Sequence, residues 1–230
     1  MKILSIIPAY NESTHIEGVV EGVRKHLPVL VVDDGSVDGT GTGAIRAGAT
    51  VLRQAPNQGK GKALKIGFRW ALEHGYQAAV TLDADGQHDP EEIPIFLNAY
   101  RERGADLIIG ARDFSQIPHV RRVANTLGRW ILSWSMRQLI LDNQSGYRLA
   151  SSRMMQAALE STEHGFQFEV EMIVICIQKG FQLEWVPIRT IYAGESSHIK
   201  PLQHLLEFTQ MALRARRQTQ EFYKRQNEGR

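Results

Sequence analysis

The first half of the chain alternates short apolar runs with longer segments in which apolar residues recur at helical spacing. Strands are predicted at five runs: KILSII, VLVVDD, TVLRQ, QAAVTLD and ADLIIG. Pro8 is predicted to end the first strand, and Asn11 to cap a helix that extends to about His26. Strands that alternate with helices predict an α/β fold with a mostly parallel central sheet and helices on both faces.

The second half of the chain is predicted to add helices and two more strands. Residues 120–140 predict an amphipathic helix in which Trp130 and Trp134 lie among arginines. A short strand in SGYRLASS, a helix in FEVEMIVICIQKG and a strand in QLEWVPI follow, and one long helix begins near Pro201. We therefore expect one domain over residues 1–200 and a basic helical tail over residues 201–230.

Composition narrows the class of protein. Of the 230 residues, 43% are hydrophobic, which is enough for a large core, and the formal net charge is only +2. This charge balance argues against a nucleic-acid partner. The single cysteine, Cys176, excludes an internal disulfide and a cysteine metal cluster. No signal peptide is indicated, and no uncharged apolar run reaches the roughly 18 residues of a membrane span. We expect a cytoplasmic protein, either soluble or peripheral on the inner face of the membrane.

Polar side chains gather where the predicted strands end. Parallel strands bring their carboxyl ends to one edge of the sheet, and ligands of such sheets bind beyond that edge. The residues predicted to meet there are Pro8, Ala9, Tyr10, Asp33, Asp34, Asp83, Asp85 and Arg112. Residues that are far apart in sequence are therefore expected to form one site.

The segment DADGQH predicts a metal site. A regular strand would point Asp83 and Asp85 to one face, and carboxylates this close repel unless a cation neutralises them. Gln87 adds an amide oxygen, and Mg²⁺ typically combines such ligands with waters and substrate phosphates. The alternative interpretation is a solvated turn in which Asp89 caps the helix that Pro90 opens.

The other strand ends favour a nucleotide. Asp33 and Asp34 can accept hydrogen bonds from a base or a ribose, although Asp-Gly and Ser are also common turn formers. Tyr10 can stack on a base and Glu12 can bind ribose hydroxyls, unless this segment only stops a strand and caps a helix.

Three basic residues predict phosphate contacts. Lys60 lies at a glycine-rich helix start, where backbone amides attract phosphate, but Pro56 breaks the P-loop pattern. The glycines of GTGTGAIRAG do not follow a strand directly, so they do not form a dinucleotide-binding fingerprint. Arg112 and Arg148 have side chains that pair bidentately with phosphate, whereas the alternative for either is an ordinary ion pair.

In this order, IIPAYNE, VVDDGSVDGT, NQGKGKALKIGF, TLDADGQHDPEEI, IIGAR and DNQSGYRL resemble the family 2 inverting glycosyltransferases with the GT-A fold, especially the dolichyl- or polyprenyl-phosphate mannose synthase branch. The resemblance implies a nucleotide-diphosphate sugar donor whose base and ribose are held by Pro8, Ala9, Glu12 and Asp33. It implies that Mg²⁺ or Mn²⁺ is held by Asp83, Asp85 and Gln87. This metal and Arg112 would stabilise the departing nucleoside diphosphate.

The acceptor is predicted to be a polyprenyl phosphate or another lipid-linked group. A sugar hydroxyl needs a general base, for which Glu169 and Glu171 are candidates, with Glu171 assigned to catalysis. A lipid phosphate is already anionic and needs cationic positioning instead. The helix over 120–140 is predicted to lie in a membrane interface, or else to use Ile131, Trp134 and Leu139 as core or homo-oligomer contacts.

Two other functions share part of this pattern. A nucleotidyltransferase has the same sheet and metal carboxylates, but needs a glycine-rich triphosphate loop after the first strand, where this chain has PAYNE. A non-catalytic nucleotide-sugar-binding module is the second alternative, and Asp83, Asp85 and Arg148 argue against it.

Overall fold

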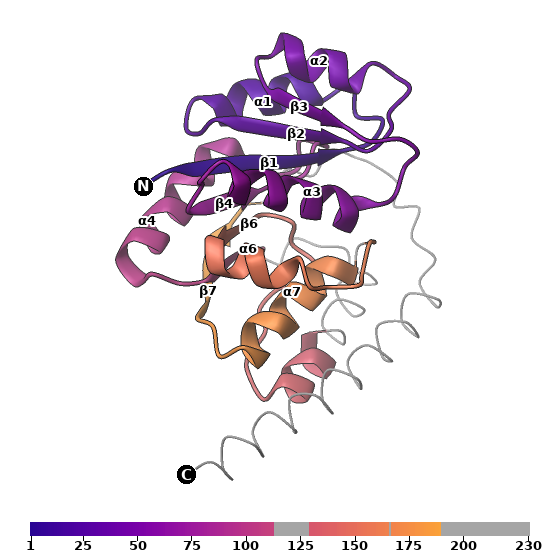
Figure 1. The fold of residues 1–230 in the computed structure, drawn as a ribbon. Coiled ribbons are helices and arrows are strands. Elements are labelled where there is room, and N and C mark those ends of the chain that lie inside the picture. The colour runs from indigo at the N-terminus through magenta and orange to yellow at the C-terminus, as the bar shows by residue number, and fades with distance from the viewer. Residues whose placement is uncertain (113–128, 166, 190–230) are drawn as a thin grey trace.

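The computed structural model describes residues 1–112, 129–165 and 167–189. Its centre is one seven-stranded sheet (Figure 1) in which β6 alone is antiparallel to its neighbours. From edge to edge the strands are β3 (Thr50–Arg53), β2 (Val29–Asp33), β1 (Ile3–Ala9), β4 (Ala78–Thr81), β6 (Arg148–Ser151), β5 (Leu107–Arg112) and β7 (Leu183–Ile188). The predicted mostly parallel α/β sheet is confirmed.

Helices cover both faces of this sheet, as Figure 1 shows. One face packs against α1 (Ile16–Arg24), α2 (Thr40–Arg46) and α4 (Ile93–Arg103), which the short 3-10 helix η1 (Pro90–Glu92) precedes. The other face packs against α3 (Lys60–Glu73), α6 (Ser152–Ala158), α7 (Gln167–Gln178) and the helical residues 129–136. The predicted cap of η1 is confirmed, because the Asp89 side chain accepts a hydrogen bond from the Glu91 amide.

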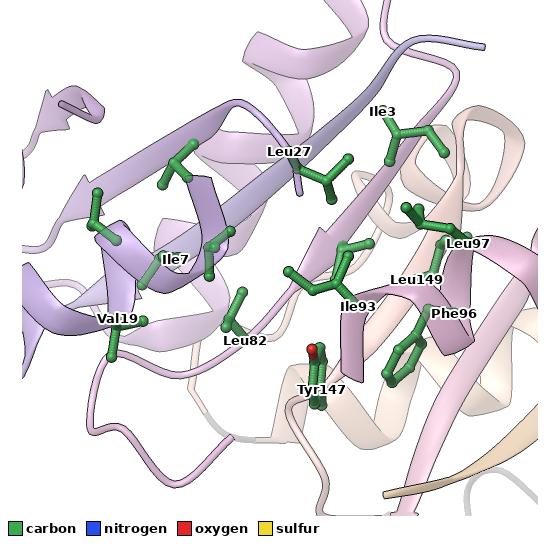
Figure 2. Packing of buried hydrophobic residues seen from close by; sticks show 14 of the residues in the cluster. Ile3, Ile7, Val19, Leu27, Leu82, Ile93, Phe96, Leu97, Tyr147 and Leu149 are labelled. Atoms are coloured by element: carbon green, nitrogen blue, oxygen red, sulfur yellow. The ribbon is translucent and has the colours of Figure 1, made fainter. Parts of the chain in front are cut away.

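The strands divide their side chains between two apolar layers. Along β1, Ile3 and Ile7 point toward α1 and α4, whereas Leu4 and Ile6 point toward α3. Figure 2 shows the first layer, where Phe96 and Tyr147 stack with ring centroids 4.4 Å apart. The central strands β1, β2 and β4 are buried along their whole length, because helices cover both faces of the sheet.

Two predictions about the first βα connection are wrong. Pro8 does not end β1, which continues to Ala9. The pairing of β1 with β4 ends at Ile6 and Thr81, so the missing amide hydrogen of Pro8 costs no bond to β4. Asn11 does not cap α1, whose N-cap residue is His15. Asn11 instead has a positive φ of 56°, and its side chain accepts a hydrogen bond from the Val37 amide.

Two predicted helices extend beyond the described residues. Of the helix predicted over 120–140, residues 129–136 are helical, and residues 113–128 lie outside the description. The predicted tail over 201–230 lies outside it entirely. Among the residues that are described, no helix is both long and apolar enough to cross a membrane.

The close approach of α3 to β1 gives a test of this packing. A Cβ atom on Gly67 would come within 2.5 Å of Ile6 Cγ2, whereas one on Gly18 of α1 would meet nothing within 4 Å. We expect Gly67→Ala to lower the melting temperature, since overpacking costs about 1–3 kcal/mol and exceeds the gain in helix propensity. Gly18→Ala should raise the melting temperature, because replacing a glycine within a helix by alanine increases the free energy of unfolding by about 0.5–1 kcal/mol. Equal effects of the two substitutions in thermal unfolding would contradict this packing.

Candidate active site

The site lies at the carboxyl edge of the sheet, where the antiparallel β6 begins beside the end of β4. Thr81, the last residue of β4, pairs with Arg148, the first residue of β6. The segment before β6 is therefore held against the segment after β4, and the Thr81 hydroxyl donates to the Gly146 carbonyl at 2.9 Å. This pairing brings residues 142–146 to the predicted ligand edge.

A buried lysine joins two carboxylates at the centre of the site. The Lys60 ammonium lies 2.5 Å from Asp83 Oδ1 and 3.1 Å from Glu169 Oε1, and only 14% of the Lys60 side chain is exposed. Burial opposes the charged form of Lys60, but the two carboxylates outweigh it and raise its pKa. Burial likewise works against Asp83, and Lys60 overcomes it to lower the pKa of Asp83 to about 2. Lys60 and Asp83 are therefore held as charged groups.

Asp85 carries the second carboxylate of the predicted pair, but the geometry differs from the prediction. The strand ends at Thr81, so Asp83 and Asp85 lie in a turn rather than on one face of a strand. Asp85 Oδ1 accepts the Gln87 amide at 2.9 Å. Burial and the neighbouring Asp83 charge raise the pKa of Asp85. A cation placed beside Asp85 would relieve both causes.

His88 fixes the position of this turn, which sequence reasoning missed. It is buried, and its Nδ1 accepts a hydrogen bond from the Asp83 amide at 3.2 Å. Its ring lies 5.1 Å from the Tyr147 ring, and burial lowers the pKa of His88. Nδ1 must be unprotonated to accept that bond, so the structure assigns a neutral imidazole.

Asp33 and Asp34, although adjacent, differ in what they contact. The Asp34 carboxylate accepts from the Gln58 amide at 2.9 Å and the Gly59 amide at 2.7 Å, so it holds the loop that leads into Lys60. Asp33 Oδ1 accepts from the Ser36 amide, whereas the buried Asp33 Oδ2 has no hydrogen-bond partner among the described residues. The nearest cationic group, Arg53 Nε, lies 3.8 Å from Asp33 Oδ2, beyond hydrogen-bond distance. A donor on a ligand would satisfy this buried acceptor.

The segment after β1 presents the remaining predicted nucleotide contacts. Pro8 and Ala9 are buried at the end of the strand, whereas the Tyr10 side chain is 49% exposed. The Glu12 amide donates to Thr40 Oγ1 at 2.8 Å, and the Glu12 carboxylate lies 3.5 Å from His15 Nδ1. These contacts fix the backbone around an exposed aromatic ring.

Arg112 is the last residue of β5, and its side chain forms a bidentate ion pair with Asp142, which the sequence analysis did not select. Its Nε donates to Asp142 Oδ2 at 2.7 Å, and its terminal nitrogen donates to Asp142 Oδ1 at 3.0 Å. Asp142 is fully buried, and Asp142 Oδ1 also accepts the amides of Gln144 and Ser145. The positive charge of Arg112 contributes to the lowered pKa of Asp83.

Arg148 is buried beneath the site rather than exposed at its surface. Its Nε donates to the Ser145 carbonyl at 2.7 Å, and a terminal nitrogen donates to the Glu169 carbonyl. The other terminal nitrogen has no partner among the described residues. Arg148 thus links the segment before β6 to α7.

Gly146 permits the closest approach in the site. A Cβ atom there would lie 2.8 Å from both carboxylate oxygens of Asp83 and 2.9 Å from the Lys60 ammonium. Separations under 3.0 Å between such atoms force a displacement. Only glycine at this position leaves the Lys60–Asp83 pair where it is.

Two predicted roles differ from the contacts that the structure shows. Glu171 accepts a hydrogen bond from the Ser161 hydroxyl, so the structure brings Glu169, rather than Glu171, to Lys60. The helix start at Lys60 was expected to offer its amides to phosphate. Instead, the Gly59 amide donates to Asp34 and the Lys62 amide donates to the His164 carbonyl at 3.1 Å.

The chemistry of the edge fits a divalent cation that is shared with a ligand. Within the described ranges, no group of three or more His, Cys, Asp or Glu side chains forms a complete metal cage. Asp85, with Asp83 and Gln87 beside it, offers hard oxygen ligands of the type that Mg²⁺ supplements with water and phosphate oxygens. The residues present therefore fit a metal that arrives with a diphosphate.

Solved structures of another enzyme have the same fold as this chain. Glucosyl-3-phosphoglycerate synthase from Mycobacterium tuberculosis, solved in complex with Mn²⁺, UDP and glucosyl-3-phosphoglycerate, matches with a TM-score of 0.71 and 19% identity. The match covers 93% of this chain and 78% of that one. Another structure of that enzyme contains Mg²⁺ and UDP. These neighbours are GT-A glycosyltransferases, which confirms the predicted fold class.

Two relatives have higher sequence identity. An undecaprenyl-phosphate mannosyltransferase of Micrococcus luteus is 36% identical over 208 residues, covering 82% of this chain and 83% of the relative. A polyprenol monophosphomannose synthase of Mycolicibacterium smegmatis is 34% identical over 205 residues, covering 81% of this chain and 76% of the relative. The family model described as glycosyl transferase family 2 matches residues 5–161. The chain therefore belongs to glycosyl transferase family 2, and it is a glycosyltransferase with the GT-A fold.

Proposed function

We propose that this glycosyltransferase moves a sugar, with inversion and with a divalent cation, from a nucleotide-diphosphate donor to a polyprenyl phosphate or another lipid-linked acceptor. The observation that carries the proposal is the alternation of charge around the end of β4. There the Lys60 ammonium contacts the Asp83 carboxylate, the positive charge of Arg112 also acts on Asp83, and Asp85 follows two residues later. A diphosphate with its cation complements this pattern of charge.

The donor's nucleoside is assigned to the ends of β1 and β2. The buried Asp33 Oδ2 lacks a hydrogen-bond partner among the described residues, so it suits a ring N–H or a ribose hydroxyl. Pro8, Ala9 and Glu12 line the neighbouring strand end, and the exposed Tyr10 ring offers a stacking surface. Asp34 contributes indirectly, because its carboxylate is committed to the loop before Lys60.

The diphosphate is assigned to the acidic turn. Because Lys60 neutralises Asp83, Asp85 is the main anionic ligand for Mg²⁺ or Mn²⁺, with Asp83 and Gln87 beside it. Such a cation would supply positive charge for the departing nucleoside diphosphate. Arg112 would add a second positive charge there, and such stabilisation of developing charge is usually the largest catalytic term. Arg148 supports this arrangement from below.

A lipid phosphate acceptor removes the need for a general base. One of its oxygens would attack the anomeric carbon, and the bond from that carbon to the diphosphate oxygen would break, leaving the electron pair on the nucleoside diphosphate. Attack from the opposite face inverts the anomeric centre. Glu169 is engaged by Lys60 and Glu171 by Ser161, which favours an acceptor that is already ionised. With a hydroxyl acceptor, Glu171 or Glu169 would have to accept the proton.

We also propose that residues Trp130, Trp134 and Leu139 form a membrane-facing patch. Their side chains are 74%, 59% and 70% exposed, which rules out the predicted core role for Trp134 and Leu139. The tryptophans are four residues apart and so share one face of the helical residues 129–136. The exposed Arg137 adds positive charge. Tryptophan with arginine suits the headgroup region of an anionic bilayer, where a lipid acceptor would be found.

The donor and metal assignment predicts a metal-dependent thermal shift. UDP- and GDP-sugars are each tested with and without Mn²⁺. We expect one of these donors to raise the melting temperature of the protein, and to do so only when Mn²⁺ is present. Asp85→Ala should abolish the metal-dependent part, whereas Glu91→Ala, which removes an exposed carboxylate elsewhere, should retain it. A shift that Asp85→Ala leaves intact would refute the metal assignment, and no shift with any donor would count against the function.

The close approach at Gly146 predicts a catalytic defect without unfolding. In Gly146→Ala the added methyl group must displace Asp83 or Lys60, and misplacement by about 1 Å can cost roughly 100-fold in rate. We expect turnover of the donor that the thermal-shift screen selects to fall by about 10- to 100-fold, while the far-UV circular dichroism spectrum stays native. Gly18→Ala, an insertion of the same methyl group into open space, should keep full turnover. Unchanged turnover in Gly146→Ala would show that the pair tolerates displacement.

The patch predicts binding to anionic vesicles. Trp130→Ser combined with Trp134→Ser should reduce cosedimentation with phosphatidylglycerol vesicles several-fold, while turnover of a short-chain, water-soluble acceptor phosphate stays at the wild-type level. Ile45→Ser, at an equally exposed apolar position on α2, should bind vesicles like the wild type. Wild-type vesicle binding by the double variant would contradict the patch, and a change from dimer to monomer instead would assign it to self-association.

A further inference from the structure

We propose that Asp142 is a positioning residue for transfer, which holds the Arg112 guanidinium where the leaving diphosphate needs it. This inference rests on the proposed function, because it takes Arg112 as the group that meets the diphosphate. Asp142 itself is completely buried and lies behind Arg112, whose side chain is 19% exposed. The carboxylate therefore acts through the arginine rather than on the substrate.

The contact has the geometry of a fixed fork. Two Arg112 nitrogens donate to the two Asp142 oxygens at 2.7 and 3.0 Å, and the Arg112 backbone amide lies 3.3 Å from Asp142 Oδ2. A planar guanidinium that is held at two points and at its own backbone loses most of its side-chain freedom before the substrate binds. Preorganised charge of this kind needs no rearrangement during the reaction.

Asp142 also ties Arg112 to the rest of the site. Asp142 Oδ1 accepts the Gln144 and Ser145 amides at 3.0 and 3.1 Å, and the Ser145 carbonyl accepts Arg148 Nε. The next residue, Gly146, is the one that abuts Asp83 and Lys60. Arg112 and the Lys60–Asp83 pair are therefore positioned by one short segment, residues 142–146.

The test separates the fork from this turn. In Asp142→Asn, an amide oxygen at the Oδ1 position keeps both turn bonds and the bond from the Arg112 terminal nitrogen. The amide nitrogen at the Oδ2 position faces Arg112 Nε and cannot accept from it, so the variant removes one arm of the fork and the negative charge. We expect turnover to fall roughly 10- to 100-fold, and the affinity for inorganic diphosphate with Mn²⁺ to weaken in isothermal titration calorimetry. Asp106→Asn is the matched control, since Asp106 accepts the Gln182 amide and pairs with Arg153 at the opposite end of β5. That control should keep wild-type turnover and diphosphate affinity.

A double-mutant cycle decides whether Asp142 acts through Arg112. Arg112→Ala should reduce both readouts at least as much as Asp142→Asn, and the double variant should be no worse than Arg112→Ala alone. Fully additive losses, or wild-type values in Asp142→Asn, would overturn the inference. If the wild type neither bound diphosphate nor transferred any sugar, the proposed function would fail and this inference with it. Normal wild-type activity with additive losses would instead refute the role of Asp142 alone.

Discussion

The ion cluster formed by Lys60, Asp83 and Glu169 is the contact on which the arrangement of the site depends. An ammonium with only 14% of its side chain exposed would be costly without partners, and two carboxylates at 2.5 and 3.1 Å supply them. These three residues come from α3, the turn after β4, and α7. The cluster therefore fixes three segments relative to one another at one end of the sheet.

Several local features of the chain serve this cluster. Asp34 binds the amides of Gln58 and Gly59 and so sets where α3 begins. Gly61 allows α3 to approach α7, because a Cβ atom there would lie 2.6 Å from Phe168 Cβ. Gly146 leaves room on the other side. The glycines of NQGKGK thus serve packing, and the amides of Gly59 and Lys62 are already bonded within the protein.

Sequence reasoning found the strands and the edge because both depend on local patterns. Apolar runs of four to seven residues mark the strands, and parallel topology alone brings Asp33, Asp83 and Arg112 to one edge. Asp142 was missed because its role depends on β6 running antiparallel between β4 and β5, which no local pattern reveals. The choice of Glu171 over Glu169 failed to anticipate which face of α7 meets α3. The sequence does not distinguish the roles of Asp33 and Asp34, which become clear only from their hydrogen-bond partners in the structure.

The balance of charge explains why an acidic turn can stand at a site for an anionic ligand. Lys60 offsets one of the two carboxylates that it contacts. Asp85 adds a further carboxylate, and burial and the charge of Asp83 raise the pKa of Asp85. The Asp142 carboxylate offsets part of the positive charge that Arg112 presents to the turn. The acidic turn as a whole therefore keeps excess negative charge, which a diphosphate alone would find repulsive. A diphosphate that brings a divalent cation does not meet that repulsion, so the residues of this edge favour the metal-bound donor over the bare one.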